Sequence, residues 1–141
     1  MKVGNGSEGF DVSPDGKEVW VANAQDGTIS VIDRASKRVV ATLNSNTRGA
    51  NRLKFTPDGR RVLVSLLGGS GVVVVDAKTR AVTQKIAMPG HGCAGIQMQP
   101  DGARAYVSCE QVEVIDLKSM KVTGQIDAGG NPDGLAWAVE R

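Results

Sequence analysis

Three side chains that could bind a metal ion or take part in redox chemistry occur close together in the sequence. His91 is the only histidine of the chain, and Cys93 and Cys109 are its only cysteines. Imidazole and thiolate groups are favoured ligands of zinc, and a pair of cysteines can also exchange between thiols and a disulfide. Which chemistry is open to them depends on the elements that position them.

Those elements belong to an internal repeat. The turns Pro14-Asp15-Gly16, Pro57-Asp58-Gly59 and Pro100-Asp101-Gly102 stand 43 residues apart. Pro presets φ at the second turn position, and Gly supplies a positive φ two residues later. A short apolar alternation precedes each turn and a Val-rich segment follows it, in which Trp20, Leu63 and Tyr106 share one position.

Two further Val- and Ile-rich segments complete each repeat. They cover residues 28–33 and 38–43, 71–76 and 81–86, and 112–116 and 121–126. All are bounded by Gly, Asp, Ser or Asn, as strands are, and no helical periodicity is sustained. We therefore predict an all-β fold of four-stranded antiparallel β-propeller blades. One unit, 1–141, holds blades at about 9–44, 52–87 and 95–127, and an extra inner strand at about 134–139.

The second strands carry a recognisable signature. It reads Trp20-Val21-Ala22-Asn23, Leu63-Val64-Ser65-Leu66 and Tyr106-Val107-Ser108-Cys109. This pattern resembles the bacterial YVTN-repeat family of β-propellers, whose relatives include lactonases and the haem d1 domain of a nitrite reductase. The resemblance implies seven-bladed rings that are often periplasmic or secreted, although Met1–Phe10 does not read as a signal peptide. With three blades, the chain is interpreted as the C-terminal part of such a ring.

Composition argues against several kinds of partner. The net charge is +2 and only 4% of residues are aromatic, which disfavours nucleic acid; single-stranded DNA binding is kept as a second alternative function. No apolar run approaches the roughly 18–20 residues of a membrane span. An arc of three blades would leave two bare apolar faces, so we expect a homodimer or another homo-oligomer.

The register of the hairpin around Pro100-Asp101-Gly102 determines whether the two cysteines lie opposite each other. With a two-residue turn at Asp101-Gly102, Cys93 faces Glu110; a one-residue bulge would place Cys93 opposite Cys109, within disulfide reach. Unpaired structural cysteines are the favoured interpretation. A disulfide is the next alternative, and a metal site with His91 is the least favoured.

Two sets of repeat-equivalent polar residues are candidates for ligand binding. One set lies in loops at one rim of the predicted propeller, 43 residues apart: Asn5, Arg48 and His91. The other set lies on the predicted inner strands: Asp11, Lys54 and Gln97. Equivalent positions that differ in chemistry suit a binding site at the mouth of a ring. The favoured alternative is that they are solvated or make hydrogen bonds between blades.

These patterns favour a non-catalytic module for binding or scaffolding. We expect its ligand to be an unknown protein or small molecule, with no cofactor. No Ser-His-Asp arrangement is legible, and a single histidine leaves acid–base catalysis few participants. The alternative function is a partial lactonase-like hydrolase whose site needs other blades.

Overall fold

The chain forms three separate four-stranded antiparallel sheets. The structure, a computed structural model, describes residues 1–69 and 71–139. The strands of the described part are β1 (Ser7–Val12), β2 (Glu18–Asn23), β3 (Thr28–Asp33), β4 (Arg38–Asn44), β5 (Ala50–Phe55), β6 (Arg61–Leu66), β7 (Val72–Asp76), β8 (Val82–Ile86), β9 (Ile96–Met98), β10 (Arg104–Ser108), β11 (Val112–Asp116) and β12 (Lys121–Ile126). The predicted all-β class is confirmed.

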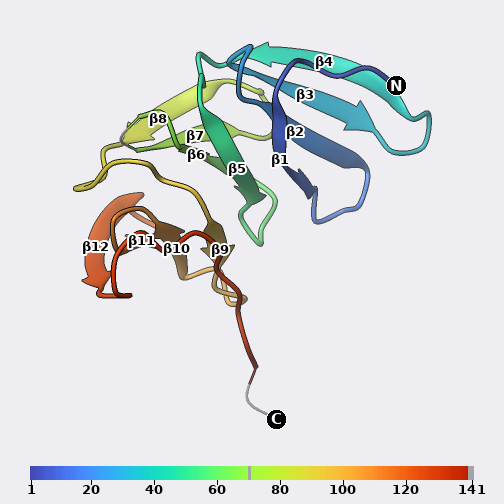
Figure 1. Cartoon of the computed structure of the whole chain (residues 1–141). Helices are drawn as coiled ribbons and strands as arrows, with labels where there is room; N and C mark the ends of the chain where they lie inside the picture. The colour runs from blue at the N-terminus through green and yellow to red at the C-terminus, as the bar shows by residue number, and fades with distance from the viewer. Residues whose placement is uncertain (70, 140–141) are drawn as a thin grey trace.

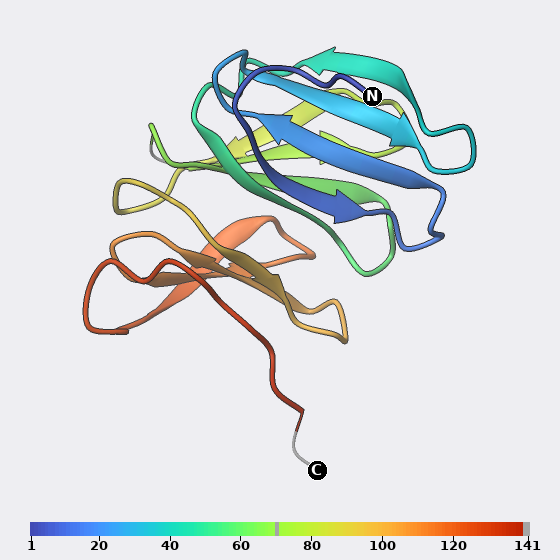
Figure 2. The same cartoon turned by 45° about the vertical axis from the view of Figure 1, so that its right-hand side comes forward.

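Each sheet is a meander of consecutive strands. We call β1–β4 blade 1, β5–β8 blade 2 and β9–β12 blade 3. The blades are stacked in a fan that does not close, with the inner strands β1, β5 and β9 along one side (Figures 1 and 2). No helix occurs in residues 1–69 and 71–139, and hence none that could cross a membrane.

Two apolar cores lie between the blades. Because side chains alternate between the faces of a strand, Val62 and Val64 of β6 join the core shared with blade 1, whereas Leu63 joins the core shared with blade 3. In the first core, Trp20 meets Phe55 edge to face, with ring centroids 5.4 Å apart. Each pair of blades is therefore held together chiefly by burial of apolar surface.

The face of blade 1 that points away from blade 2 is not covered by another blade. Phe10, Leu53 and Ile96 hold the same repeat position, but Phe10 is 65% exposed while Leu53 and Ile96 are 1% and 4% exposed. Leu53 and Ile96 each have a preceding blade to pack against, and Phe10 has none. The difference comes from position in the arc and not from residue type.

The extra inner strand expected at 134–139 is not formed as a strand. Residues 132–139 run beside β9 as extended chain without strand pairing (Figure 2). A β-strand requires a ladder of backbone hydrogen bonds, and within residues 132–139 the described part of the chain shows one, from the N–H of Gly95 to the carbonyl of Asp133 at 3.0 Å.

The third turn of every blade is built on an aspartate. Asp33 accepts hydrogen bonds from the backbone N–H and hydroxyl of Ser36, at 2.7 and 2.6 Å. Asp76 and Asp116 do the same with Thr79 and Ser119. These bonds hold the pKa of each carboxyl below its usual range. The aspartates are therefore turn residues.

These turns predict a loss of stability in acid. Folding lowers the three pKa values, so the ionised carboxyls stabilise the fold above the unfolded-chain pKa of about 4, and this contribution is lost as the pH falls below it. We expect the thermal midpoint to be nearly flat from about pH 7 to 5 and to fall below about pH 4. The triple variant D33N/D76N/D116N should have a lower midpoint at pH 7 and a shallower acid slope by circular dichroism. An unchanged slope, equal to that of the control E110Q, would contradict this.

Candidate functional site

A cleft runs along the inner strands, on the side that faces the centre of the arc. Its volume is about 350 Å3. Successive inner segments line it at equivalent heights: residues 8–10 of β1, 52–54 of β5, 95–97 at β9, and 133–135 of the C-terminal segment. This surface is the candidate ligand-binding site, because it is where side chains from all three blades converge.

Two cationic side chains of this wall, Lys54 and Arg52, lie near carboxylates of blade 1. Lys54 Nζ lies 3.2 Å from Asp11 Oδ1, and the backbone N–H of Phe55 donates to Asp11 Oδ2 at 2.9 Å. Arg52 lies 4.0 Å from Glu8. Asp11 therefore ties blade 1 to blade 2, which is the interblade role favoured by the sequence.

The third member of that set behaves differently. Gln97 lines the cleft together with Lys54 but donates its amide to the backbone carbonyl of Met98, at 2.9 Å. Lys54 and Gln97 thus line the cleft, and Asp11 contacts Lys54 without being part of the lining.

The other predicted set converges only in part, since Asn5 and Arg48 meet at Asp26 and His91 lies elsewhere. Asn5 donates its backbone and side-chain N–H groups to Asp26, at 2.8 and 3.0 Å, and the charge of Arg48 lies near the same carboxylate. The bonds from Asn5 lower the pKa of Asp26, with a smaller contribution from the charge of Arg48. His91 lines a separate cleft of about 440 Å3, beside Glu110.

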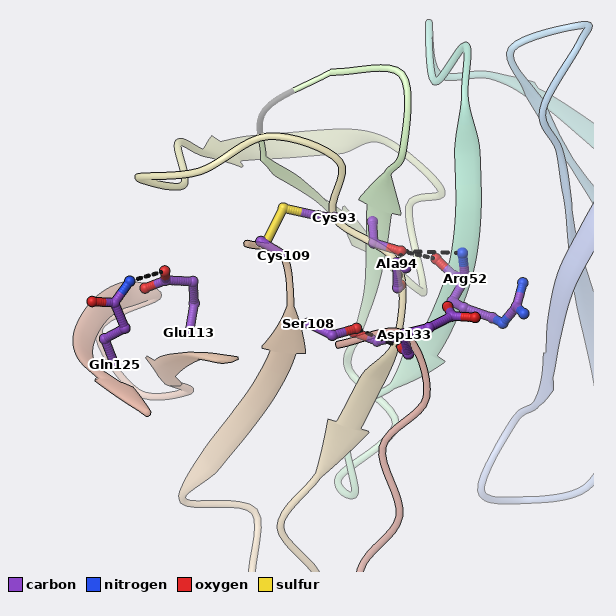
Figure 3. The surroundings of a disulfide bond; sticks show 10 residues. Arg52, Cys93, Ala94, Ser108, Cys109, Glu113, Gln125 and Asp133 are labelled. Atoms are coloured by element: carbon purple, nitrogen blue, oxygen red, sulfur yellow. Dashed lines mark hydrogen bonds between the residues drawn. A yellow bond between two sulfur atoms is a disulfide. The ribbon is translucent and has the colours of Figure 1, made fainter. Parts of the chain in front are cut away.

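The two cysteines form a disulfide (Figure 3). The N–H of Ser108 donates to the carbonyl of Gly95 at 3.0 Å, and its carbonyl accepts from the N–H of Ala94 at 2.7 Å. Two residues therefore oppose one, which is a β-bulge. The shift places Cys93 across from Cys109 with their Cα atoms 4.1 Å apart.

This geometry corrects the favoured interpretation of the cysteines. The expectation of unpaired cysteines is wrong, because the turn residues alone do not reveal the bulge on which the pairing depends. The sulfur atoms bonded to each other are not available as thiolate ligands. Among residues 1–69 and 71–139, no group of three or more His, Cys, Asp or Glu side chains could hold a metal ion.

One buried carboxylate lies near the disulfide but outside the cleft. Glu113 is 1% exposed, faces Val107 across the sheet and accepts a hydrogen bond from Gln125 at 2.9 Å (Figure 3). Its second oxygen has no partner in the described part of the chain. Because it is sealed between blades 2 and 3, we assign it no contact with a ligand.

Three parts of the cleft lining are not predicted as site residues from the sequence: Arg52, Glu8 and residues 133–135. A signal was present for Arg52, since it stands at the repeat position of Gly9 and Gly95. A cation at a position otherwise held by glycine is the kind of variation that marks the mouth of a ring. Residues 133–135 line the cleft because of the path that the C-terminal segment takes in the folded chain.

Three stacked four-stranded meanders with their inner strands around a common wall define an arc of a β-propeller. Residues 4–91 match the family model of the cytochrome D1 heme domain. The chain belongs to this family, so the cytochrome d1-like part of the expected resemblance is confirmed. No curated protein matches the chain.

Solved structures support the same fold. Hydrazine synthase of Kuenenia stuttgartiensis superposes with a TM-score of 0.86 at 24% identity, over 95% of this chain and 40% of that chain. The WD40 repeats of RRP9 superpose with a TM-score of 0.79 at 12% identity, over 91% and 40%. The chain thus spans about 40% of the length of these two propellers.

The family name implies a haem, which would need a ligand for its iron in the cleft. Haem iron takes its axial ligand from His, Cys, Met or Tyr. None of these lines the described cleft, and His91 lines a different one. The residues present do not fit an iron-bound haem in this cleft, and no step through one is derived.

The disulfide predicts a measurable loss of stability on reduction. A cross-link between residues 16 apart is worth about 3 kcal/mol, mainly by restricting the unfolded chain. Thiol titration of the unfolded, unreduced protein should find no free thiol, and reduction should lower the denaturant midpoint. The matched control is C93A/C109L, which copies the pair Ala50 and Leu66 at the same position of blade 2. It should resemble the reduced protein and ignore reductant. Two free thiols before reduction would contradict the assignment.

The interblade role of Asp11 predicts unequal effects for the two members of its ion pair. Asp11→Ala leaves the buried N–H of Phe55 without an acceptor and should cost about 1–3 kcal/mol. Lys54→Met removes only a half-exposed ion pair and should cost less than about 1 kcal/mol. Urea denaturation of both variants measures the difference. Equal losses would show that the charge pair, and not the backbone bond, is what Asp11 provides.

Proposed function

We propose that this chain is a non-catalytic β-propeller module for binding or scaffolding, completed through the open ends of its arc by self-association or by further blades. The observation that carries this proposal is the exposure of Phe10, at 65%, in a position that is buried in blades 2 and 3. Apolar side chains exposed at the end of a stack of sheets favour association. The repeat residues build blades, so the fold itself does not imply an enzyme.

The candidate cleft offers groups for binding. Its carboxylate Glu8 lies 4.0 Å from Arg52, the neighbouring Asp11 is held by Lys54 and a backbone N–H, and Asp133 adds a further carboxylate to the lining. The mixed charges and backbone groups of the wall suit recognition of a small polar molecule or a loop of a protein.

Self-association of the purified chain tests the proposal. By sedimentation equilibrium we expect a mass above that of one chain, rising with concentration. Phe10→Asp should shift the distribution at least tenfold in concentration toward the single chain, because it places a charge on the open face. Val40→Asp is the matched control, since Val40 is 50% exposed on the outermost strand of the same blade.

Two results would contradict the proposal. One is a folded single chain at every concentration together with an unchanged Phe10→Asp variant. The other is steady hydrolysis of a lactone substrate by the purified chain, which would favour the alternative of a lactonase-like enzyme.

A further inference from the structure

A second groove lies between blades 1 and 2, where the hairpin turns of the two blades come together. Its volume is about 610 Å3, within the range of pockets that bind small ligands. Its lining includes Pro14 and Glu18 of blade 1 and Phe55, Gly59 and Ala77 of blade 2. We call it the turn groove, and it shares no lining residue with the cleft along the inner strands.

The turns that frame this groove recur between blades 2 and 3. A Cβ at Gly59 would lie 3.5 Å from the ring of Pro14. A Cβ at the repeat equivalent Gly102 would lie 3.8 Å from the ring of Pro57. The paired turns therefore approach each other alike in both places.

The backbone on the other side of the frame is also the same. The N–H of Ala77 donates to the carbonyl of Arg60 at 2.9 Å. The N–H of Leu117, its repeat equivalent, donates to the carbonyl of Ala103 at 3.0 Å. The place between blades 2 and 3 differs from the turn groove in its side chains and not in its backbone.

Between blades 2 and 3 the chain fills this place with its own side chains. Leu117 is 6% exposed and belongs to the apolar core shared by the two blades. Arg61 reaches across from blade 2 and donates from Nη1 to the carbonyl of Leu117, at 2.9 Å. An aliphatic side chain and a hydrogen-bond donor therefore occupy the place together.

The turn groove carries other residues at both positions. Ala77 stands where Leu117 stands, and it is a partly buried residue against the core of blades 1 and 2. Glu18 stands where Arg61 stands, and its carboxylate accepts a hydrogen bond from Arg80 at 2.7 Å. An ionised carboxylate only accepts, so it does not donate to a carbonyl as a guanidinium does. Neither the aliphatic group nor the donor is supplied by these two positions.

The charges around the turn groove favour a neutral ligand. Three carboxylates of the lining face three nearby cations: Asp15, Glu18 and Asp58 against Lys17, Lys78 and Arg80. Opposite charges that are interspersed in this way produce no strong field of one sign. The apolar members of the lining, Phe55 and Ala77, therefore decide which ligand fits.

We propose that the turn groove binds an aliphatic side chain, of leucine or isoleucine, carried by a peptide segment of a partner protein. The side chain takes the place that Leu117 takes between blades 2 and 3. An amide N–H of the segment donates to the carbonyl of Ala77, in place of the Arg61 guanidinium. This goes beyond the proposed function, because the groove lies between two blades of one chain and does not require the arc to associate.

Nuclear magnetic resonance titration of the 15N-labelled chain tests this with two probes, acetyl-leucine N-methylamide and acetyl-glycine N-methylamide. The leucine probe should shift the amide signals of Gly59, Ala77 and Lys78. It should bind at least about tenfold more tightly than the glycine probe, because its side chain is removed from water. Equal binding of the two probes overturns the proposal, and so do shifts confined to the cleft along the inner strands.

Two leucine substitutions separate the groove from the rest of blade 2. Ala77→Leu supplies the side chain that Leu117 provides in the next blade, and it should weaken binding of the leucine probe at least about tenfold. Ala81→Leu is the matched control, since Ala81 is exposed on the same blade, and it should bind the probe as the native chain does. Undiminished binding by folded Ala77→Leu contradicts the proposal. If that variant does not fold, Ala77→Val is used in its place, and the comparison of the two probes on the native chain decides in either case.

A second copy of the chain is the alternative occupant. In that case the signals of Gly59 and Ala77 would shift on dilution of the native chain without any probe, and the proposal would be wrong. Phe10→Asp, which weakens the self-association expected from the proposed function, should bind the leucine probe unchanged. Failure of the chain to self-associate therefore leaves the result of the titration intact.

Discussion

The structure depends on the fact that a propeller blade has two apolar faces. Side chains alternate along every strand, so blade 2 sends Val62 and Val64 to one neighbour and Leu63 to the other. A sheet of this kind is stable only when both faces are covered. Both cores of the molecule, and the exposed Phe10 at its end, follow from this requirement.

Polar contacts between blades fix how the blades are oriented against each other in that apolar packing. Asp11 accepts the N–H of Phe55, and the hydroxyls of Ser65 and Ser108 donate to carbonyls of the following inner segment. Each bond joins a side chain of one blade to a backbone group of the next inner segment. Together they set how closely one inner strand approaches the next, and so they shape the wall on which Lys54 and Arg52 lie. The candidate site is thus a consequence of blade docking.

The bulge next to β9 shows how one residue of register alters chemistry. In all three blades the inner strand slips by one residue, which pairs Ser7 with Asn23 and Ala50 with Leu66. In blade 3 the same slip brings two cysteines together, and the side chains that could have been metal ligands become a cross-link. A disulfide of this kind is stable in oxidising compartments.

The sequence by itself determined the blades, because turn chemistry, strand alternation and a 43-residue period are local properties that recur three times. It also identified Asp11 and Lys54 as equivalent positions of inner strands. Only the tertiary structure decided that these two touch while His91 lies apart from Asn5 and Arg48, because loop conformation and blade docking involve residues far apart in the chain. The same holds for the disulfide, which needed a bulge that no residue type announces. It holds also for residues 133–139, which lie against blade 3 through the contacts of Asp133 with Ser108 and of Trp137 with Tyr106.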